Sequence, residues 1–354
     1  MRKSLQFPIL IHFVLILAIG SGMHGSVIAA DHLFSVVRDG HIGDDSRRLG
    51  FINGRGELKI GFRYYYSHEF SDGMAAVLEK KGGKWGYIDE TGDLVIQPQF
   101  DKAASFSNGR TKVRKDGREF FLARDGRVAF ETSLFTLGFK EGLSNARAAG
   151  KWGFIDQNGK VAIAFRFQGT YPFSENMAAA VDNGLVGYID RSGDWVIEPR
   201  FPPMENDLDQ LFLSYFSEGV AVYREGSNYG YIDRAGNTVI PASFERAQPF
   251  SEGLAVVRIG GKYGFVNKSG EFAIKPRFQF GKSFANGLAP VKDGSKWGFI
   301  DSKGNPKIAP RFESAESFKH GLARVSFLGN DDHENERHGY INTDGEVVYS
   351  WKSF

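Results

Sequence analysis

The stretch KWGYIDETGDLVIQPQF at residues 84–100 decides the fold, because close copies of it recur along the chain. Each copy has an aromatic residue followed by Gly, a short apolar run, an Asp or Asn with Gly three residues later, and a second apolar run that ends on Phe. Self-similarity at a fixed period is the signature of a repeat protein, so we expect one array of about nine units. Clear copies begin at residues 84, 151, 186, 229, 262 and 296, and weaker copies surround Gly50, Glu119 and Gly339.

The spacing within the units is nearly constant. Counted from the Gly that follows the aromatic residue, neighbouring units lie 33 to 36 residues apart, except for steps of 43 and 41 residues where the chain has insertions. An aromatic residue follows this Gly after 14 residues in seven units, and only Ser133 and Ser353 replace it. A further Phe comes six residues later in seven units, for example Phe106. Such constant spacing predicts a fixed structural register.

A period of 34 residues also occurs in helical tetratricopeptide repeats, so the local pattern must decide between helix and strand. The apolar runs are short, rich in aromatic residues and bounded by Asp-x-x-Gly, and none has the ten or more residues that a helix needs. The pattern therefore predicts three antiparallel strands in a meander for each unit. The first strand is illustrated by residues 253–257 of one copy, and the second and third by residues 85–89 and 95–100 of another. The composition of 32 Phe, 13 Tyr and 44 Gly agrees with an all-β fold.

The recurrent residues of the unit have predicted structural roles. Gly86 is expected to remove a side chain so that a neighbouring aromatic ring can lie over the strand. Asp89, Asp156, Asp190, Asp233 and Asp301 suit Asx turns. The missing N–H groups of Pro98, Pro199, Pro276 and Pro310 mark an edge strand or a strand end.

Two architectures fit three-stranded units in series over residues 31–354: an open superhelical or solenoid-like array, or a closed propeller-like ring of eight or nine small blades. We favour the propeller-like arrangement, because each unit reads as a self-contained antiparallel meander. The degenerate first and last copies are typical of capping units.

These residues resemble the WG-repeat, or KWG-repeat, family of bacterial proteins, which is named for the Lys-Trp-Gly seen at residues 84–86, 151–153 and 296–298. The resemblance covers roughly residues 33–354. It implies a β-rich repeat protein, often exported, and it supplies no catalytic motif. The third copy departs from the family pattern, with Glu119 at the Gly position and Ser133 at the Phe position, which puts its packing in question.

Residues 1–30 are predicted to be a signal peptide: Arg2 and Lys3, an apolar run over residues 7–19, then small residues, with cleavage after Ala29 or Ala30. The alternative is a retained membrane anchor, but the run is short of the ~20 residues that span a bilayer. No later segment is expected to cross a membrane. The protein is therefore expected to be periplasmic or extracellular.

The rest of the chain has equal numbers of basic and acidic side chains and no clustered Lys/Arg run, so no nucleic-acid partner is expected. The absence of Cys excludes disulfides, thiolate metal sites and a cysteine nucleophile. No nucleophile elbow, Walker loop or dinucleotide-binding motif appears after the signal. We therefore predict no catalytic residue, no metal site and no cofactor.

Two groups of polar residues could take part in chemistry: the His-containing segment 331–338 and the repeated carboxylates. In Asp331-Asp332-His333-Glu334-Asn335-Glu336-Arg337-His338 the two His are five residues apart, which differs from the helical zinc motif, and a solvated loop is favoured over a metal site. The repeated Asp residues and Glu175, Glu218 and Glu252 invite a glycosidase hypothesis. An active site needs two carboxylates in different environments, whereas repetition gives every copy the same one, so turn chemistry is favoured.

The aromatic residue before the repeat Gly raises a further alternative. These residues would form a ladder along the array that stacks on sugar rings or peptide side chains, but core packing is favoured because Gly sits beside each ring. The positions are Trp85, Trp152, Tyr229, Tyr263 and Trp297.

The sequence therefore predicts an exported, non-catalytic binding or scaffold protein of the bacterial cell envelope, whose partner is a protein or a cell-wall polysaccharide. The alternative is an envelope hydrolase or a cell-wall or glycan-binding protein. The specific ligand-binding residues stay unidentified. The loops that break the repeat, at residues 202–215 and 328–338, are the predicted ligand surface, since a regular lattice most easily acquires specificity where it is irregular.

Overall fold

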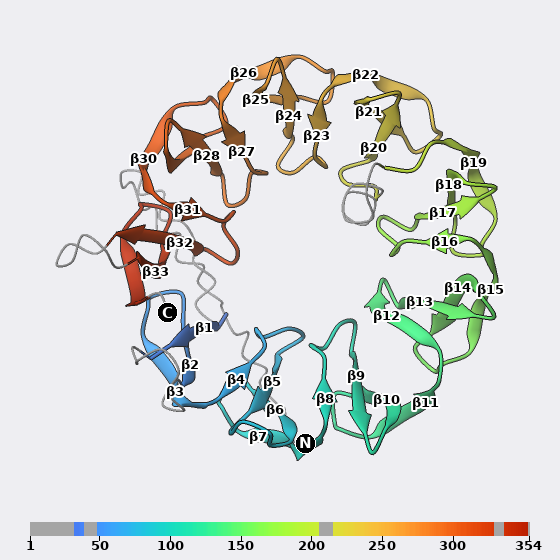
Figure 1. Ribbon diagram of the computed structural model, residues 1–354, viewed down its shortest axis with the longest axis vertical. Helices are drawn as coiled ribbons and strands as arrows, with labels where there is room; N and C mark the ends of the chain where they lie inside the picture. Colours follow the sequence, from blue (N-terminus) through green and yellow to red (C-terminus); the bar gives the residue numbers. More distant parts are fainter. Residues whose placement is uncertain (1–31, 39–47, 205–214, 329–335, 353–354) are drawn as a thin grey trace, which may run out of the picture.

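The protein forms a closed ring of nine small antiparallel sheets, a nine-bladed β-propeller (Figure 1). The structure is a computed structural model that describes residues 32–38, 48–204, 215–328 and 336–352. Within these residues there are strands and turns and no helix, so no helix capable of crossing a membrane is found there. The sequence-based expectation of an all-β, propeller-like array is confirmed.

The first five blades follow one another around the ring. Blade 1 contains β1 (Phe34–Val37), β2 (Leu49–Ile52) and β3 (Leu58–Tyr64), and blade 2 contains β4 (Tyr66–Ser67), β5 (Met74–Leu78), β6 (Trp85–Asp89) and β7 (Leu94–Phe100). Blade 3 contains β8 (Lys102–Ala103), β9 (Arg110–Lys115), β10 (Arg118–Ala123) and β11 (Val128–Thr132). Blade 4 contains β12 (Phe135–Lys140), β13 (Leu143–Ala148), β14 (Lys151–Asp156) and β15 (Val161–Phe167), and blade 5 contains β16 (Gly169–Thr170), β17 (Ala178–Asp182), β18 (Leu185–Ile189) and β19 (Trp195–Phe201).

The last four blades complete the ring. Blade 6 contains β20 (Val220–Glu225), β21 (Asn228–Asp233) and β22 (Thr238–Phe244), and blade 7 contains β23 (Arg246–Ala247), β24 (Ala255–Ile259), β25 (Lys262–Val266) and β26 (Phe272–Phe278). Blade 8 contains β27 (Phe280–Gly281), β28 (Ala289–Asp293), β29 (Lys296–Ile300) and β30 (Pro306–Phe312), and blade 9 contains β31 (Ser314–Ala315), β32 (Ala323–Leu328), β33 (Glu336–Ile341) and β34 (Val347–Lys352).

The three strands predicted for each unit are present in every blade. Seven blades have in addition a fourth strand, usually of two residues, at the inner rim of the ring (Figure 1). This innermost strand was not predicted. A two-residue strand such as Lys102–Ala103 is too short to show an alternating pattern, and it is held by its pairing with β9.

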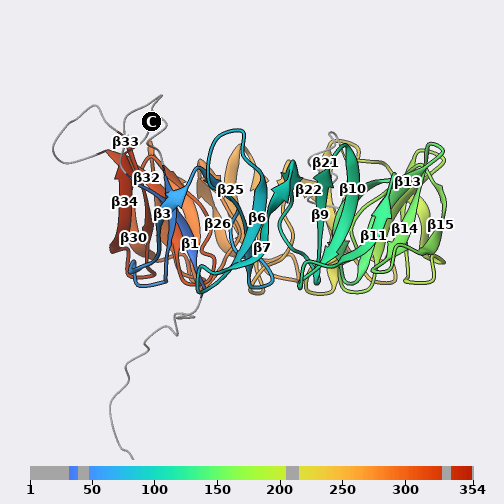
Figure 2. The same cartoon turned by 90° about the horizontal axis from the view of Figure 1, so that it is seen from below.

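Because all strands within a blade are antiparallel, the connections alternate between the two faces of the ring (Figure 2). We call one face the hairpin face: it contains the β5–β6 type hairpins and the connections from one blade to the next. The opposite face, the turn face, contains the Phe-Ser-Glu-Gly type loops and the Asp-x-x-Gly turns. The described residues that flank the gaps at 39–47 and 329–335, and Met204 before the gap at 205–214, lie on the hairpin face, whereas Tyr215 directly precedes the turn-face loop that begins at Phe216.

The Gly of the repeat makes room for backbone, which corrects the sequence-based explanation. The outer strand bulges twice opposite β6, and a Cβ on Gly86 would lie 2.7 Å from the carbonyl oxygen of Ile96 and 2.9 Å from the nitrogen of Pro98. An aromatic ring approaches as well only in some blades, such as Trp195 at Gly187. The repeat Pro lies in this bulge of the outermost strand, so the predicted edge position is confirmed.

Blade 3 has Glu119 instead of Gly at this position, and its outer strand differs accordingly. Its outer strand has a single register shift opposite β10, placed between Phe121 and Leu122, and Glu119 pairs directly with Thr132. Because the outer strand has no bulge beside Glu119, there is space for a side chain there. Glu119 forms ion pairs with Arg114 at 2.8 Å and with Lys112 at 3.2 Å. The departure from Gly therefore accompanies a different outer strand, and blade 3 keeps its four-stranded sheet.

The core lies between blades. The Phe that opens each turn-face loop packs on the aromatic side chain of the preceding blade that follows the repeat Gly, as in Tyr87–Phe106 at 5.1 Å and Phe265–Phe284 at 5.0 Å between ring centroids. Buried side chains of adjacent blades form continuous clusters at these junctions. The constant spacing of the second Phe in the sequence is thus explained by packing across each junction.

Blades 9 and 1 meet through the same contact that joins all the other adjacent blades, and this contact closes the ring. The Gly of each Asp-x-x-Gly turn has a positive φ and lies on the outer strand of the preceding blade, as Gly92 lies on Ile60. Gly56 of blade 1 lies in the same way on Val348 of blade 9. The Tyr340 hydroxyl of blade 9 also donates a hydrogen bond to the carbonyl oxygen of Ser35 at 3.3 Å.

Candidate binding site

The recurrent Glu side chains of the turn face join neighbouring blades. Glu175 accepts a hydrogen bond from the N–H of Gly219 at 3.0 Å, and Glu252 accepts one from the N–H of Gly287 at 2.9 Å. Glu218 lies at the equivalent place and accepts from Gly253. These carboxylates therefore have a structural use that is the same in each blade.

The recurrent Asp side chains form the predicted Asx turns. Asp89 accepts hydrogen bonds from the N–H groups of Thr91 at 2.9 Å and Asp93 at 3.1 Å, and Asp190 repeats the pattern with Ser192. The hydrogen bond from the Thr91 hydroxyl, helped by the backbone N–H groups, holds the pKa of Asp89 below its usual value. Carboxylates kept ionised in identical turns do not provide the two contrasting environments that a glycosidase requires.

The His-containing insertion is only partly described. Residues 331–335, including His333, lie outside the described residues. His338 belongs to β33 and lies beside Trp351, with 6.0 Å between ring centroids, and burial lowers its pKa. Among the residues that the structure describes, no group of three or more His, Asp or Glu side chains is positioned to hold a metal ion.

The five aromatic residues proposed as a ladder pack mainly against other elements. Trp85 contacts Tyr66 on the innermost strand of its own blade and His68 directly after that strand, and Tyr229 is buried. Nearly all the ring partners of these residues lie on innermost strands, which the sequence did not reveal. Their ring contacts are Trp85–Tyr66, Trp85–His68, Trp152–Phe135, Tyr263–Phe280 and Trp297–Phe280.

The connections between blades follow one pattern that is absent between blades 3 and 4, where the N–H of Leu134 donates to the Thr132 hydroxyl, and between blades 5 and 6. At six connections, the residue after the outer-strand aromatic donates its N–H to a carbonyl oxygen on the second strand of the next blade. The bonds are Tyr65 to Leu78, Asp101 to Arg114, Gln168 to Val181, Glu245 to Arg258, Gln279 to Lys292 and Glu313 to Ser326, at 2.8 to 3.0 Å.

The side chains of several of these residues add a second bond to the same junction. Gln168 accepts from the N–H of Gly184 at 2.7 Å, and Gln279 accepts from the N–H of Gly294 at 3.1 Å, each in the hairpin of the next blade. Backbone and side chain together therefore seal the junction on the hairpin face.

Pro202 occupies this position between blades 5 and 6. Proline has no N–H to donate, and its ring offers no acceptor to the following hairpin. The equivalent carbonyl on β20 belongs to Arg224, by the alignment of Arg224 with Tyr229 and of Arg258 with Tyr263. The chain leaves the repeat at Pro202, and the blades are separated there by a groove.

The groove has a volume of about 540 Å³ and runs from the hairpin of blade 6 to its Asp-x-x-Gly turn. Its floor contains Phe201 and Tyr223, whose rings are 5.6 Å apart. Its polar lining is formed by Arg200, Arg224, Glu225, Asn237 and Thr238, so that aromatic surface lies next to hydrogen-bonding groups of both signs.

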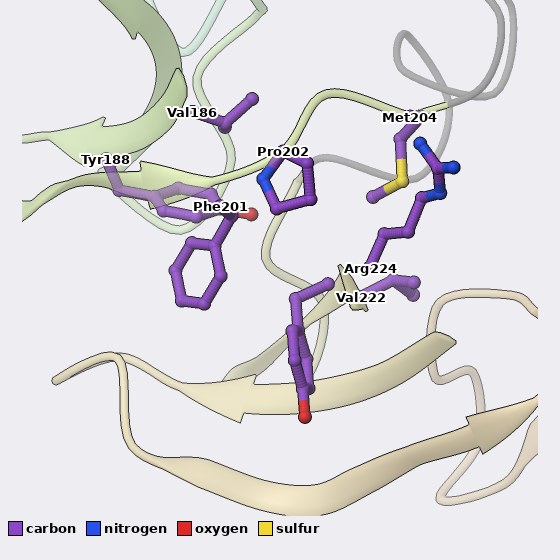
Figure 3. Close-up of a pocket in the computed structure, with 8 residues that line it drawn as sticks. Val186, Tyr188, Phe201, Pro202, Met204, Val222 and Arg224 are labelled. Carbon is purple, nitrogen blue, oxygen red and sulfur yellow. The ribbon is translucent and has the colours of Figure 1, made fainter. Parts of the chain in front are cut away.

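A small apolar recess adjoins the groove (Figure 3). Pro202 lies between Phe201 on one side and Met204 on the other, and Arg224 lies beside Met204. Arg224 donates a hydrogen bond to the carbonyl oxygen of Pro203 at 3.1 Å, which ties the connection to β20. The recess is thus closed by the described start of the insertion.

These residues overlap the first of the two loops that the sequence analysis predicts as a ligand surface. The predicted loop 202–215 begins with Pro202–Met204 at the groove, while residues 205–214 lie outside the described residues. Of the second loop, 328–338, the flanking strands β32 and β33 are described and reach the same hairpin face. The sequence did not indicate the groove itself, although Pro202 in place of Asp, Gln or Glu is a visible signal for it.

Comparisons with known proteins agree with the fold. The family model of the WG containing repeat matches residues 50–85, 85–118, 152–185, 187–202, 229–263, 263–297 and 297–330. No curated protein gives a significant match.

Solved structures are similar to this chain at low sequence identity. A crystal structure of "the eukaryotic initiation factor" is similar with a TM-score of 0.60 and 9% identity, covering 91% of this chain and 96% of that one. The dihydro-heme d1 dehydrogenase NirN gives a TM-score of 0.43 at 15% identity, covering 91% and 73%, and apo AztD from Citrobacter koseri gives 0.39 at 12%, covering 78% and 93%. At 9% identity, the similarity to the initiation factor shows a shared fold alone.

Proposed function

The chain belongs to the family of proteins built from the WG containing repeat, and we propose that it is an exported, non-catalytic binding or scaffold protein of the bacterial cell envelope. The observation that carries the proposal is the groove at Pro202, where the seal present at six other connections is missing. A groove lined by aromatic and polar groups is typical of a binding site.

The position of the groove also supports binding of a partner. Its hairpin end lies on the face where the repeat is interrupted, so a partner that enters it meets irregular, specific surface rather than the repeated lattice. Arg224 and Glu225 give it charges of both signs, which suits a protein segment or a polysaccharide with polar substituents.

The non-catalytic part of the proposal rests on how the recurrent polar groups are used. Glu175, Glu218 and Glu252 bind backbone N–H groups of the next blade, and the repeat Asp side chains bind their own turns. Groups that are engaged in the same way in several blades are not free to act as a catalytic acid and base. The export part rests on the signal-like residues 1–30.

The binding proposal is tested by restoring, at position 202, the hydrogen-bonding groups that join the blades at the other connections. Pro202→Gln restores an N–H and the amide found at Gln168 and Gln279, and it is expected to draw the hairpin of blade 6 against the connection. The full chain without residues 1–30 is immobilised and exposed to envelope extract of the producing organism. We expect the wild type to capture a defined protein or polysaccharide and Pro202→Gln to lose it.

Gln168→Glu is the matched control, because it keeps an acceptor at a sealed connection, and it is expected to capture the component as the wild type does. Equal capture by Pro202→Gln, verified as folded by circular dichroism, would remove the groove as the site. If no envelope component is captured by the wild type, the binding function itself is wrong.

A further inference from the structure

A row of three aromatic rings spans the junction between blades 7 and 8. Phe280, the first residue of innermost strand β27, stacks on Tyr263 of β25 with 5.3 Å between centroids and an interplanar angle of 20°. On its other side, Trp297 of β29 lies at 6.3 Å. Phe280 is 52% exposed, and Tyr263 and Trp297 are partly exposed. The row therefore offers aromatic surface to a ligand.

Blade packing does not require the exposed ring at this position. The equivalent residues at the start of the innermost strand are Lys102, Gly169, Arg246 and Ser314 in blades 3, 5, 7 and 9. Where the innermost strand is described, an aromatic residue occurs there only in blades whose repeat has Trp before Gly. These pairs are Tyr66 with Trp85, Phe135 with Trp152 and Phe280 with Trp297, and the three partners of Trp are each more than half exposed.

Three basic side chains lie close to the row. Lys292 lies between the two rings of blade 8 in the sheet register, opposite both Phe280 and Trp297. The Lys282 amine lies 5.3 Å from the centroid of the Trp297 ring and donates to the carbonyl oxygen of Ala315 at 2.8 Å. Arg258 lies 5.9 Å from the centroid of the Tyr263 ring.

The nearby acidic groups are mostly neutralised by partners. Glu245 pairs with Arg258 at 3.3 Å, and Glu313 pairs with Lys296. Asp293 remains in the exposed hairpin of blade 8. The charge of Glu316 acts on Lys282, so Lys292, which lies between the rings in the sheet register, is the cation that the row offers to an anionic group.

We propose that the Tyr263–Phe280–Trp297 row binds a polysaccharide that bears carboxylate groups. The C–H bonds on the face of a sugar ring carry partial positive charge and are attracted to the negative face of an aromatic ring. Lys292 supplies the cation for a carboxylate. This inference rests on the proposed function as a binding module, and it places a second site outside the groove at Pro202.

A polymer is favoured over an anionic membrane by the position of the rings. Phe280 and its counterparts belong to the inner rim of the sheets, whereas the hairpins at their level begin with Lys, Asp and Gly residues such as Asp293 and Gly294. A flat lipid surface would meet the hairpins, while a single extended chain can follow the rim. The pairs at blades 2 and 4 would add avidity for a long polymer.

The test uses polygalacturonate as the acidic polymer and dextran as a neutral one, with the chain lacking residues 1–30. Binding is measured by titration calorimetry and by tryptophan fluorescence. We expect polygalacturonate to bind and dextran to bind far more weakly. Phe280→Ala is expected to weaken binding about tenfold, and Lys292→Gln is expected to weaken it and to reduce its salt dependence.

Phe272→Ala is the matched control, since Phe272 is also an exposed aromatic residue but lies on outer strand β26, and it is expected to bind as the wild type does. Equal losses in Phe280→Ala and Phe272→Ala would overturn the proposal. So would wild-type binding to vesicles with anionic lipid without binding to polygalacturonate. If polygalacturonate fails to bind while Pro202→Gln still abolishes capture from the extract, this inference fails and the proposed function stands.

Discussion

Gly56 in the first blade lies on Val348 in the last blade. In each of the remaining blades, the turn Gly lies in the same way on the outer strand of the preceding blade. Gly56 and Val348 are almost 300 positions apart in the sequence, and their contact closes the ring. The choice between an open array and a propeller, which the sequence left open, is decided by this contact.

Because Gly56 lies at the contact that closes the ring, Gly56→Ala should lower the free energy of unfolding more than a Gly→Ala change at an open position. Gly56 and Gly117 have nearly the same positive φ, 80° and 79°, but a Cβ on Gly56 would collide with the backbone of Val348 whereas a Cβ on Gly117 meets nothing within 4 Å. Both variants should lose about 1 kcal/mol through backbone strain, and Gly56→Ala should lose about 2 kcal/mol more through overpacking. Thermal and urea unfolding measure the difference. Equal losses would mean that blades 1 and 9 do not touch in solution.

The repeat Gly should be intolerant of even one methyl group. In Gly86→Ala the new Cβ would lie 2.7 Å from the carbonyl oxygen of Ile96, on backbone that is fixed in the bulge. We expect a loss of about 1 to 3 kcal/mol of unfolding free energy. Gly61→Ala, on the outer strand β3 of the preceding blade, is the control, because a Cβ there meets nothing within 4 Å, and it should be nearly neutral. A neutral Gly86→Ala would show that the outer strand can move away.

An Arg of the outer strand should stabilise the junction that it spans. Arg277 donates a hydrogen bond to the carbonyl oxygen of Gly304 in the next blade at 2.7 Å, and its guanidinium lies 4.8 Å from the centroid of Phe278. Because the side chain is exposed, we expect Arg277→Ala to cost only about 1 kcal/mol in urea unfolding. Ser243 occupies the same position in blade 6, and Ser243→Ala should cost almost nothing. A matching loss in both variants would contradict a role for the Arg.

The closing junction should make stability depend on pH. The rings of His32 and His320 stack at 3.8 Å, and burial, followed by the charges of His320 and Lys319, lowers the pKa of His32 to about 4. The folded chain therefore binds fewer protons than the unfolded chain between pH 6.5 and about 4, and stability falls as the pH falls through that window. Above pH 6.5 this contribution is fully present.

The measurement is urea unfolding at pH 7.5 and pH 4.5. After allowance for partial exposure, the wild type should lose about 1 to 2 kcal/mol more over this interval than His32→Gln, which cannot titrate. The difference between the two proteins removes the contributions of the other His residues. Identical pH dependence in both would show that His32 is not buried against His320.

Much of the blade could be predicted from the sequence because its signals are local. Strand β6, the Asx turn at Asp89 and the constant position of Phe100 follow from pattern and turn chemistry within 17 residues. The innermost strand could not be predicted, since two residues such as Lys102–Ala103 show no periodicity and are held by a neighbouring strand. Closure depends on Gly56 and Val348, which no local pattern connects.

The candidate sites were predicted only in part for the same reason. The interruption after Phe201 was visible, but the groove arises from an N–H that Pro202 lacks, and the importance of that N–H emerges only from the six connections that use it. The proposed ladder placed Trp297 and Tyr263 in a row of equivalent positions. The structure instead joins them through Phe280, which belongs to a strand that the sequence did not reveal.

Each blade is made from one continuous stretch of chain, and the last blade meets the first without exchanging a strand. A gene of this kind can gain or lose a whole unit by duplication or deletion, because every remaining blade keeps all of its strand partners. The new neighbours would meet through the same turn Gly and the same Phe. Ring size can therefore change during evolution in steps of one repeat, while an insertion such as the one after Met204 is inherited as a separate, local feature.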